Sequence, residues 1–252
     1  EFRPMWTWIV IGILIWIAAT SAWHFLIGPW VERRLTGDPR VVGLWLLLRV
    51  LVRIIHRVRF VGREHVPRSN RPGPLLVVSN HTGSVDPFLI QAGCPFLIHW
   101  LMASETIFPA FQWLWDLTEN VIPVDRDGRD VGPAREAIRR LRRGEVVGIF
   151  PEGRLVDPPE QIWPFVDGVG LIVNRTKCPV LLVWVSGTPA RTDVAGSLLI
   201  PSRSRVEFID VYEFEDEDDS RVITRVLREK IAAVSGWPLY DGPVSRRSDE
   251  EP

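Results

Sequence analysis

The feature that most constrains the fold is a long N-terminal run without a charged side chain. No Asp, Glu, Lys or Arg lies between Pro4 and Val31, and Trp6–Ile27 is almost wholly apolar. A helix needs about 20 apolar residues to cross the hydrocarbon layer of a bilayer, so this run is long enough. Tryptophans flank it at both ends, where indole rings favour the headgroup boundary. The sequence predicts a hydrophobic membrane helix over about residues 6–27.

Two other interpretations of this run are a secretory signal peptide and a helix buried in a globular core. The run is longer than the apolar part of a signal peptide, and no small-residue cleavage site follows it cleanly. A buried globular helix stays open as the alternative.

The next segment, Val41–Phe60, is rich in Leu, Val and Ile and also carries regularly spaced arginines. Arg49, Arg53 and Arg57 follow one another at four-residue spacing, which places them on one face of a helix. A basic amphipathic helix beside a hydrophobic one is typical of a helix lying at a lipid surface. The alternative is an ordinary surface helix packed on the domain. We therefore expect an N-terminal two-helix membrane-binding module over residues 1–62, with the amphipathic basic helix at about 41–60.

Charge and cysteine content restrict location and function class. Residues 1–72 hold 11 Lys and Arg against four Asp and Glu, and nearly all the basic excess follows the hydrophobic helix. The positive-inside rule then places the rest of the chain on the cytoplasmic face of the membrane. Two cysteines in 252 residues exclude a disulfide-framed secreted domain. A net charge of −1 argues against nucleic-acid binding by charge alone.

After a proline-rich linker at 63–74, short apolar runs alternate with helical patterns. This alternation predicts an α/β domain over residues 73–240, with a central, mostly parallel sheet flanked by helices. Residues 241–252 read as a polar tail. The expected strands are Leu75–Ser79, Ile98–Ala103, Val121–Val124, Val146–Phe150, Val180–Val185 and Val206–Val211, and the clearest helices are Pro133–Arg143 and Ser220–Val234.

The first motif with chemical content follows the first strand of this domain. His81 is succeeded five residues later by Asp86. A carboxylate that accepts from one ring nitrogen fixes the imidazole tautomer and leaves the other nitrogen to take a proton from an attacking hydroxyl. The structural alternative is that His81 caps a turn and has no catalytic role. The sequence has no G-x-S-x-G elbow, and neither cysteine has a motif around it, which favours direct attack by a substrate hydroxyl.

Two further motifs stand at strand ends. The run Val121–Val124 leads to Arg126, whose guanidinium can bind an anionic group in fork geometry. A second strand ends in Phe150-Pro151-Glu152-Gly153, which supplies a carboxylate and a permissive turn. Taken singly, either motif can be a structural salt bridge.

In this order, the motifs resemble the four sequence blocks of the glycerophospholipid acyltransferases, the group that includes 1-acylglycerol-3-phosphate acyltransferases. The resemblance covers about residues 75–190. Its blocks are Asn80-His81…Asp86, Ile122–Arg126, Phe150-Pro151-Glu152-Gly153 and Cys178-Pro179-Val180-Leu181-Leu182-Val183.

The resemblance implies transfer of a fatty acyl group from a thioester to a lysophospholipid hydroxyl, with 1-acylglycerol-3-phosphate as the first expectation for the acceptor. It assigns His81 as general base and Asp86 as its orienting partner. Arg126 would bind the acceptor phosphate, and Glu152 and Gly153 would shape the acceptor site. The donor would be acyl-CoA or acyl carrier protein, membrane lipids would be partners, and neither a metal nor a cofactor is implied.

Two departures from the family pattern concern phosphate recognition. Arg154 stands where Thr or Ser usually follows F-P-E-G, and Met102-Ala103-Ser104-Glu105 lacks the lysine of an A-K-x-E-like run. We expect Arg154 to substitute for that missing cation. The remaining alternatives are an aminolipid or glycolipid acceptor, and a catalytically silent membrane-surface protein.

Overall fold

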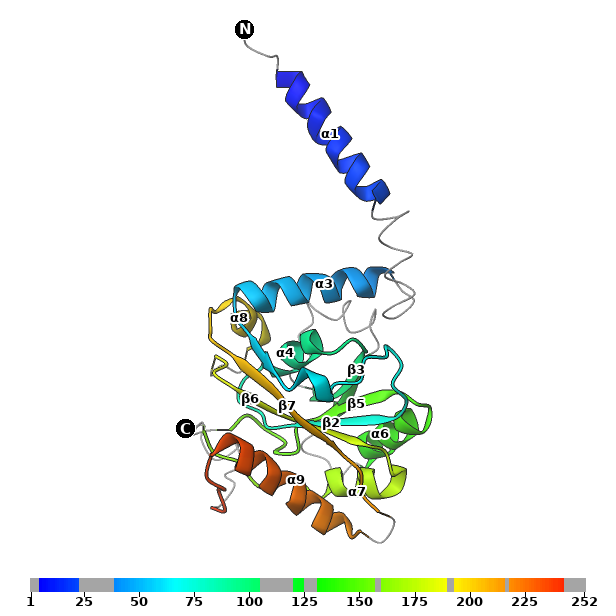
Figure 1. Cartoon of the computed structure of the whole chain (residues 1–252), viewed down its shortest axis with the longest axis vertical. Coiled ribbons are helices and arrows are strands. Elements are labelled where there is room, and N and C mark those ends of the chain that lie inside the picture. Colours follow the sequence, from blue (N-terminus) through cyan, green and yellow to red (C-terminus); the bar gives the residue numbers. More distant parts are fainter. Residues whose placement is uncertain are drawn as a thin grey trace. The chain divides into compact units, whose positions relative to one another are not determined.

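The computed structural model describes residues 5–22, 39–104, 120–124, 131–156, 160–189, 193–215 and 218–242 (Figure 1). The chain divides into two compact units, Glu1–Leu47 and Leu48–Pro252. The larger unit carries the sheet and every predicted site residue that is described.

The charge-free run forms helix α1, Met5–Ala22, of 18 residues. Several of its large apolar side chains are exposed, with Ile13, Leu14, Ile15 and Trp16 between 52% and 68% accessible. Within the described part of the chain, no helix is both long and apolar enough to cross a membrane. The predicted continuation of this helix to residue 27 lies outside the described residues.

The second helix, α3, begins at Pro39 and ends at Ile54, so the prediction of a helix continuing to residue 60 was wrong. Arg57 takes a left-handed conformation with φ 43°, and the strand β1, Arg59–Val61, follows at once. The Arg59 N–H donates to the Ser204 carbonyl at 2.9 Å, which draws the chain into the sheet. Arg57 therefore does not continue the helical arginine stripe.

The larger unit is built on a seven-stranded sheet in the order β1-β7-β6-β2-β5-β3-β4. All neighbouring strands run parallel except β6 and β7, which are antiparallel. The central strand β2 is buried along its whole length, because helices cover both of its faces. The remaining strands are β3 Ile98–Ala103, β4 Val121–Val124, β5 Val146–Ile149, β6 Val180–Ser186 and β7 Arg205–Tyr212, with β2 at Leu75–Ser79.

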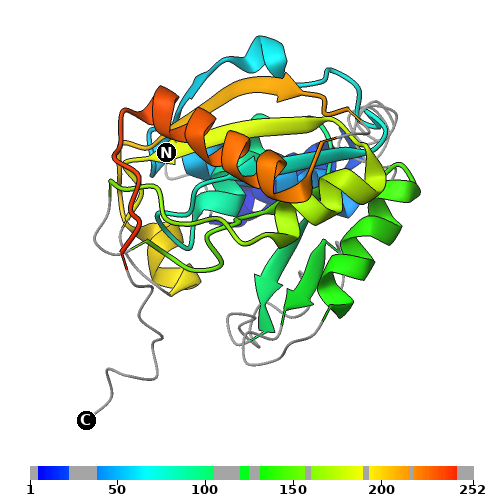
Figure 2. The ribbon, with the colours of Figure 1, turned by 90° about the horizontal axis from the view of Figure 1, so that it is seen from below.

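Helices lie on both sides of this sheet, as the views along and across it show (Figures 1 and 2). Side chains of α4, Asp86–Gly93, and α8, Val194–Leu199, pack on one face, together with the end of α3. The other face is covered by α6, Gly132–Arg142, α7, Gly168–Thr176, and α9, Ser220–Ser235. Successive side chains of β2 point to opposite faces of the sheet. Leu75 and Val77 pack in the core that contains α4, and Leu76 and Val78 pack in the core that contains α6, α7 and α9.

The predicted α/β class, with a mostly parallel sheet between helices, is confirmed. All six predicted strands and both clearest helices are present within one or two residues. The elements that the sequence analysis did not name are β1, α4, α7, α8 and a short 3-10 turn, Arg63–His65. The strand β2 lies between β5 and β6, so the segments that follow β2 and β5 emerge side by side at one edge of the sheet.

Candidate active site

The loop after β2 brings the predicted histidine and aspartate into contact. Nδ1 of His81 lies 3.0 Å from Oδ2 of Asp86. The Asp86 side chain is fully buried, whereas that of His81 keeps 16% of its surface accessible. Asp86 is also the first residue of α4, where a negative charge is favoured by the helix dipole. The loop therefore holds the carboxylate inside and presents the imidazole at the edge of the sheet.

One carboxylate oxygen organises this whole loop. Oδ2 of Asp86 accepts hydrogen bonds from the backbone N–H groups of Thr82 at 2.6 Å and Gly83 at 2.9 Å, besides its contact with His81. An ionised carboxylate can only accept, so Nδ1 of the imidazole is assigned the proton. Among the described residues no hydrogen bond reaches Nε2 of His81, which is the nitrogen left for chemistry.

Aromatic stacking fixes the plane of the imidazole. The ring of His81 stacks on Phe150 with centroids 4.1 Å apart and planes inclined by 16°. Phe150 in turn stacks on Trp100 at 4.8 Å. The Trp100 ring can pack at this place because residue 148 is a glycine. A Cβ on residue 148 would lie 2.4 Å from the Trp100 ring. Two aromatic rings, Phe150 and Trp100, thus support the candidate base.

Glu152 binds the backbone of the histidine loop. Its Oε2 accepts from the His81 N–H at 2.8 Å, and its Oε1 accepts from the Trp163 N–H at 3.2 Å. Only 5% of the residue is exposed. Burial raises the pKa of Glu152 to about 8, and the two N–H donors oppose that rise. Both oxygens of this carboxylate are engaged by the protein's own backbone, so Glu152 acts on the site by holding the loop.

The backbone of Val185 in β6 and the side chain of Thr188 just after it complete the support of the loop. The amide of Asn80 donates to the Val185 carbonyl and accepts from the Val185 N–H, both at 2.8 Å. The hydroxyls of Thr82 and Thr188 lie 2.8 Å apart. Sequence reasoning missed these partners because they lie more than 100 residues away along the chain.

The other predicted site residues are placed less completely. Arg126 lies outside the described residues, two positions beyond the end of β4. Gly153 has φ 69° and is exposed, so the turn after Glu152 uses the left-handed region that glycine adopts without strain. Arg154 is half-buried, and its guanidinium lies 6.0 Å from the centroid of the Trp163 ring. The structure therefore joins His81 directly to Asp86 and Glu152 and places Arg154 beside Trp163.

Neither cysteine is placed as a nucleophile. Cys94 and Cys178 are both buried, and burial raises the pKa of each thiol. A protonated thiol is a weak nucleophile. The dyad of His81 and Asp86 thus remains the candidate for the chemistry.

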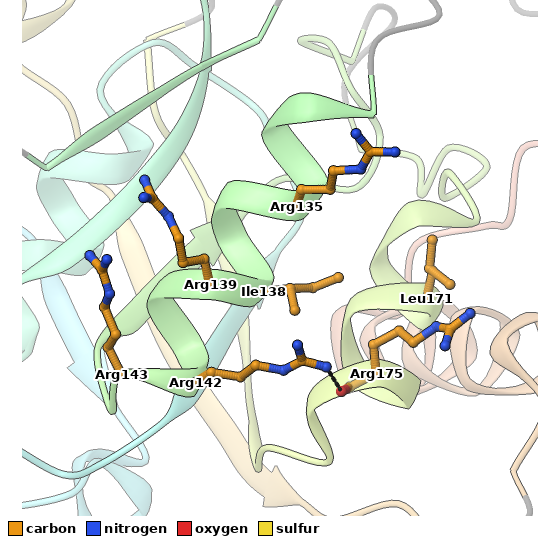
Figure 3. Close-up of a pocket in the computed structure, with 7 residues that line it drawn as sticks. All are labelled: Arg135, Ile138, Arg139, Arg142, Arg143, Leu171 and Arg175. Carbon is orange, nitrogen blue, oxygen red and sulfur yellow. Dashed lines mark hydrogen bonds between the residues drawn. The ribbon is translucent and has the colours of Figure 1, made fainter.

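A basic pocket lies away from these residues, between α6 and α7 (Figure 3). Five of its seven lining residues are arginines, and Arg142 donates to the Arg175 carbonyl at 3.4 Å. None of the dyad residues lines it. The lining residues are Arg135, Ile138, Arg139, Arg142, Arg143, Leu171 and Arg175.

Comparison with known proteins agrees with this arrangement. Residues 57–186 match the family described as Acyltransferase. The chain is 28% identical over 137 residues to a 1-acyl-sn-glycerol-3-phosphate acyltransferase of Bacillus subtilis. The aligned region covers 53% of this chain and 65% of that protein. It is 29% identical over 128 residues to an N-acylphosphatidylethanolamine synthase of Arabidopsis thaliana, covering 46% of this chain and 45% of that protein. The chain thus spans between about half and two thirds of the length of these relatives.

A solved structure shares the fold. The crystal structure of the 1-acyl-sn-glycerophosphate acyltransferase PlsC from Thermotoga maritima aligns with a TM-score of 0.63 over 90% of this chain and 94% of that one, at 19% identity. The family match covers the β2 loop, the segment after β5 and strand β6, which are the segments that build the dyad and its supports. The chain belongs to the Acyltransferase family.

Proposed function

We propose that this protein transfers a fatty acyl group from a thioester donor to the hydroxyl of a lysophospholipid, with 1-acylglycerol-3-phosphate as acceptor and phosphatidic acid as product. The observation that carries the proposal is the contact of 3.0 Å between Nδ1 of His81 and the buried Asp86 carboxylate, which leaves Nε2 of a partly accessible imidazole for proton transfer. Family membership and the Bacillus subtilis relative named as a 1-acyl-sn-glycerol-3-phosphate acyltransferase support it.

In this mechanism Nε2 of His81 takes the proton of the acceptor hydroxyl as its oxygen attacks the thioester carbonyl. The new C–O bond forms, the C–S bond breaks, and the imidazolium returns the proton to the departing thiolate. Asp86 keeps the tautomer and stabilises the transient positive charge. General-base assistance contributes about 10²- to 10⁴-fold in rate, and positioning of donor and acceptor supplies the rest.

Arg126 is the proposed ligand of the acceptor phosphate. The strand that leads to it, β4, is three strands from β2 in the order β2-β5-β3-β4, about 14 Å at the usual strand spacing. Its carboxyl end lies at the same edge as that of β2, because all the pairings between them are parallel. A long guanidinium side chain from that end can contact a phosphate while the acceptor hydroxyl is at His81. Arg154 is proposed as the second cation.

We also propose that the N-terminal helices hold the protein on a lipid surface, with the catalytic domain on the cytoplasmic side. One face of α3 packs on the core through Leu51 and Val52. Other positions of the same helix, Leu47, Val50 and Ile54, are 55–70% exposed although they are apolar. Exposed apolar side chains at helical spacing are typical of a helix that inserts into the headgroup region.

The test uses full-length protein in mixed micelles with acyl-CoA and 1-acylglycerol-3-phosphate, and phosphatidic acid is measured by mass spectrometry. We expect transfer in the wild type and a loss of at least a hundredfold in His81→Ala, with an unchanged unfolding temperature. Parallel reactions with acyl carrier protein as donor identify the thioester. Activity of His81→Ala within tenfold of the wild type would exclude the mechanism.

An aminolipid acceptor is the second candidate, because Ala103 occupies the position at which lysophosphatidate-acylating members carry a lysine, so this position supplies no cation. The similarity to an N-acylphosphatidylethanolamine synthase supports the same alternative. Phosphatidylethanolamine and lysophosphatidylethanolamine offered in the same assay separate the two acceptors.

A further inference from the structure

Arg228, on α9, binds a loop that leads to the candidate active site. Its Nε donates to the Trp163 carbonyl at 3.0 Å, and its Nη2 donates to the carbonyls of Ile162 at 3.0 Å and Tyr240 at 2.7 Å. Its Nη1 pairs with Asp241 at 2.8 Å. The side chain is only 16% exposed. One guanidinium thus joins two segments near residues 162 and 240.

The second of these segments, residues 237–242, is here called the C-terminal strap. The Ile162 N–H donates to the Pro238 carbonyl and the Tyr240 N–H donates to the Ile162 carbonyl, both at 3.0 Å. Ile162 and Leu239 form an isolated parallel bridge, and the rings of Trp163 and Tyr240 stack at 4.9 Å. The strap and Arg228 therefore hold Ile162 and Trp163 from two sides.

Three hydrogen bonds connect this arrangement to the candidate base. Arg228 holds the carbonyl of Trp163, the Trp163 N–H donates to Oε1 of Glu152, and Oε2 of Glu152 accepts the N–H of His81. If Trp163 moves, Glu152 loses one of its two donors. The backbone at His81 then loses its fixed acceptor.

The residue type suits this task. A guanidinium is planar and presents five N–H donors in a fixed fork, which can serve three carbonyls in different directions, whereas an ammonium group is a compact point charge. Arg225 lies three residues earlier on the same helix but is 67% exposed, and its only described pairing is a 4.0 Å contact with Glu229. Arg225 is therefore a matched control for the loss of one arginine from α9.

We propose that Arg228 is a positioning residue for acyl transfer: together with the C-terminal strap, it clamps Trp163 so that Glu152 holds the His81 backbone in its working position. This inference rests on the proposed function only in taking His81 as the base. It adds a residue about 75 positions beyond the F-P-E-G block to the machinery of the site.

The charge of Arg228 supplies a readout that a merely structural role would not move. Burial and, to a smaller extent, the nearby Asp86 raise the pKa of Glu152, whereas the backbone donors His81 and Trp163 and, to a smaller extent, Arg228 lower it. Removing the charge of Arg228 therefore keeps Glu152 protonated to higher pH. In a protonated carboxyl group, the oxygen that carries the proton accepts a hydrogen bond from a backbone N–H less well. The His81 loop is therefore held less firmly over that pH range.

The experiment compares full-length Arg228→Met, Arg228→Lys and Arg225→Met with the wild type. Amide hydrogen exchange at His81 is measured by mass spectrometry with fragmentation, and kcat and KM for acyl transfer are measured from pH 6 to pH 9. For Arg228→Met we expect exchange at His81 to rise at least tenfold. We expect kcat to fall about tenfold with KM within threefold, and the acidic limb of the kcat profile to move to higher pH.

Arg228→Lys keeps the charge without the fork, so we expect the acidic limb to return to its wild-type position while kcat recovers only in part. Arg225→Met should match the wild type in every measurement. If Arg228→Met does not fold, Arg228→Lys tests the clamp: faster exchange at His81 and a lower kcat than in the wild type support it, and wild-type values of both overturn it.

Wild-type exchange at His81 in Arg228→Met, or an unmoved pH profile with only a lower unfolding temperature, would overturn the clamp. An equal effect of Arg225→Met would overturn it as well. A wild type without acyl transfer would refute the proposed function instead, and the exchange comparison would still decide whether the clamp exists.

Discussion

Replacing Asp86 by asparagine separates the electrostatic role of this carboxylate from its structural role. Oδ2 accepts all three short hydrogen bonds, from Nδ1 of His81 and from the N–H groups of Thr82 and Gly83. Among the described residues, Oδ1 has only a contact of 3.5 Å with the Thr82 hydroxyl. The carbonyl oxygen of an asparagine can therefore take the place of Oδ2, with its NH₂ group in the place of Oδ1. The loop and the imidazole tautomer should survive, and only the negative charge is lost.

The size of the effect follows from the distance. Two unit charges 3.0 Å apart interact by about 5.5 kcal/mol at an effective dielectric constant of about 20. With about half of the imidazolium charge developed in the transition state, the loss is about 2.8 kcal/mol, or roughly a hundredfold in kcat. Asp86→Ala removes the acceptor as well and leaves two backbone N–H groups without a partner, at about 1–3 kcal/mol each.

The assay combines kcat for acyl transfer with the free energy of unfolding for both variants. We expect Asp86→Asn to remain within about 1 kcal/mol of the wild type in stability, because its hydrogen bonds are kept, and to lose about a hundredfold in kcat. Asp86→Ala should lose both stability and activity. The reasoning would be refuted by an asparagine variant that is as unstable as the alanine variant, or by one that keeps more than a third of wild-type kcat.

Three further predictions concern the loop and the core. A Cβ on Gly83 would lie 2.6 Å from the Pro189 carbonyl oxygen, so Gly83→Ala should displace the loop and lower kcat at least tenfold in the same assay. Because the pKa of Glu152 is raised from 4.5 to about 8 in the folded state, that state binds the extra proton between these values, and stability should fall as pH rises through this window. Glu152→Gln should abolish that slope, at most about 1.4 kcal/mol per pH unit, when unfolding is followed from pH 5 to pH 8.5; an unchanged slope would assign it to other groups. A Cβ on Gly170 would meet the Ser220 carbonyl oxygen at 1.8 Å, so Gly170→Ala should destabilise the packing of α7 on α9 by about 1–3 kcal/mol in denaturant unfolding, and a neutral effect would show that the helices can separate freely.

The sequence by itself determined the strands and the candidate dyad. Short apolar runs such as Leu75–Ser79 are typical of buried strands, and their alternation with amphipathic helices favours a layered α/β domain. The spacing of His81 and Asp86 is a local property, because both lie in the short segment between the end of β2 and the first residue of α4. Local signals of this kind do not depend on which strands become neighbours.

Only the tertiary structure decided which residues support the dyad and where helix α3 ends. The order of the strands places β5 and β6 on either side of β2, and this brings Glu152 to the His81 backbone and Val185 to Asn80. The prediction for residues 41–60 was wrong at its end because pairing with β7 outweighed the helical spacing of the arginines. Arg228 carries no motif, since its partners are backbone carbonyls, which leave no mark on the sequence that binds them. Contacts of this kind arise when distant segments pack, and so they cannot be inferred from local pattern.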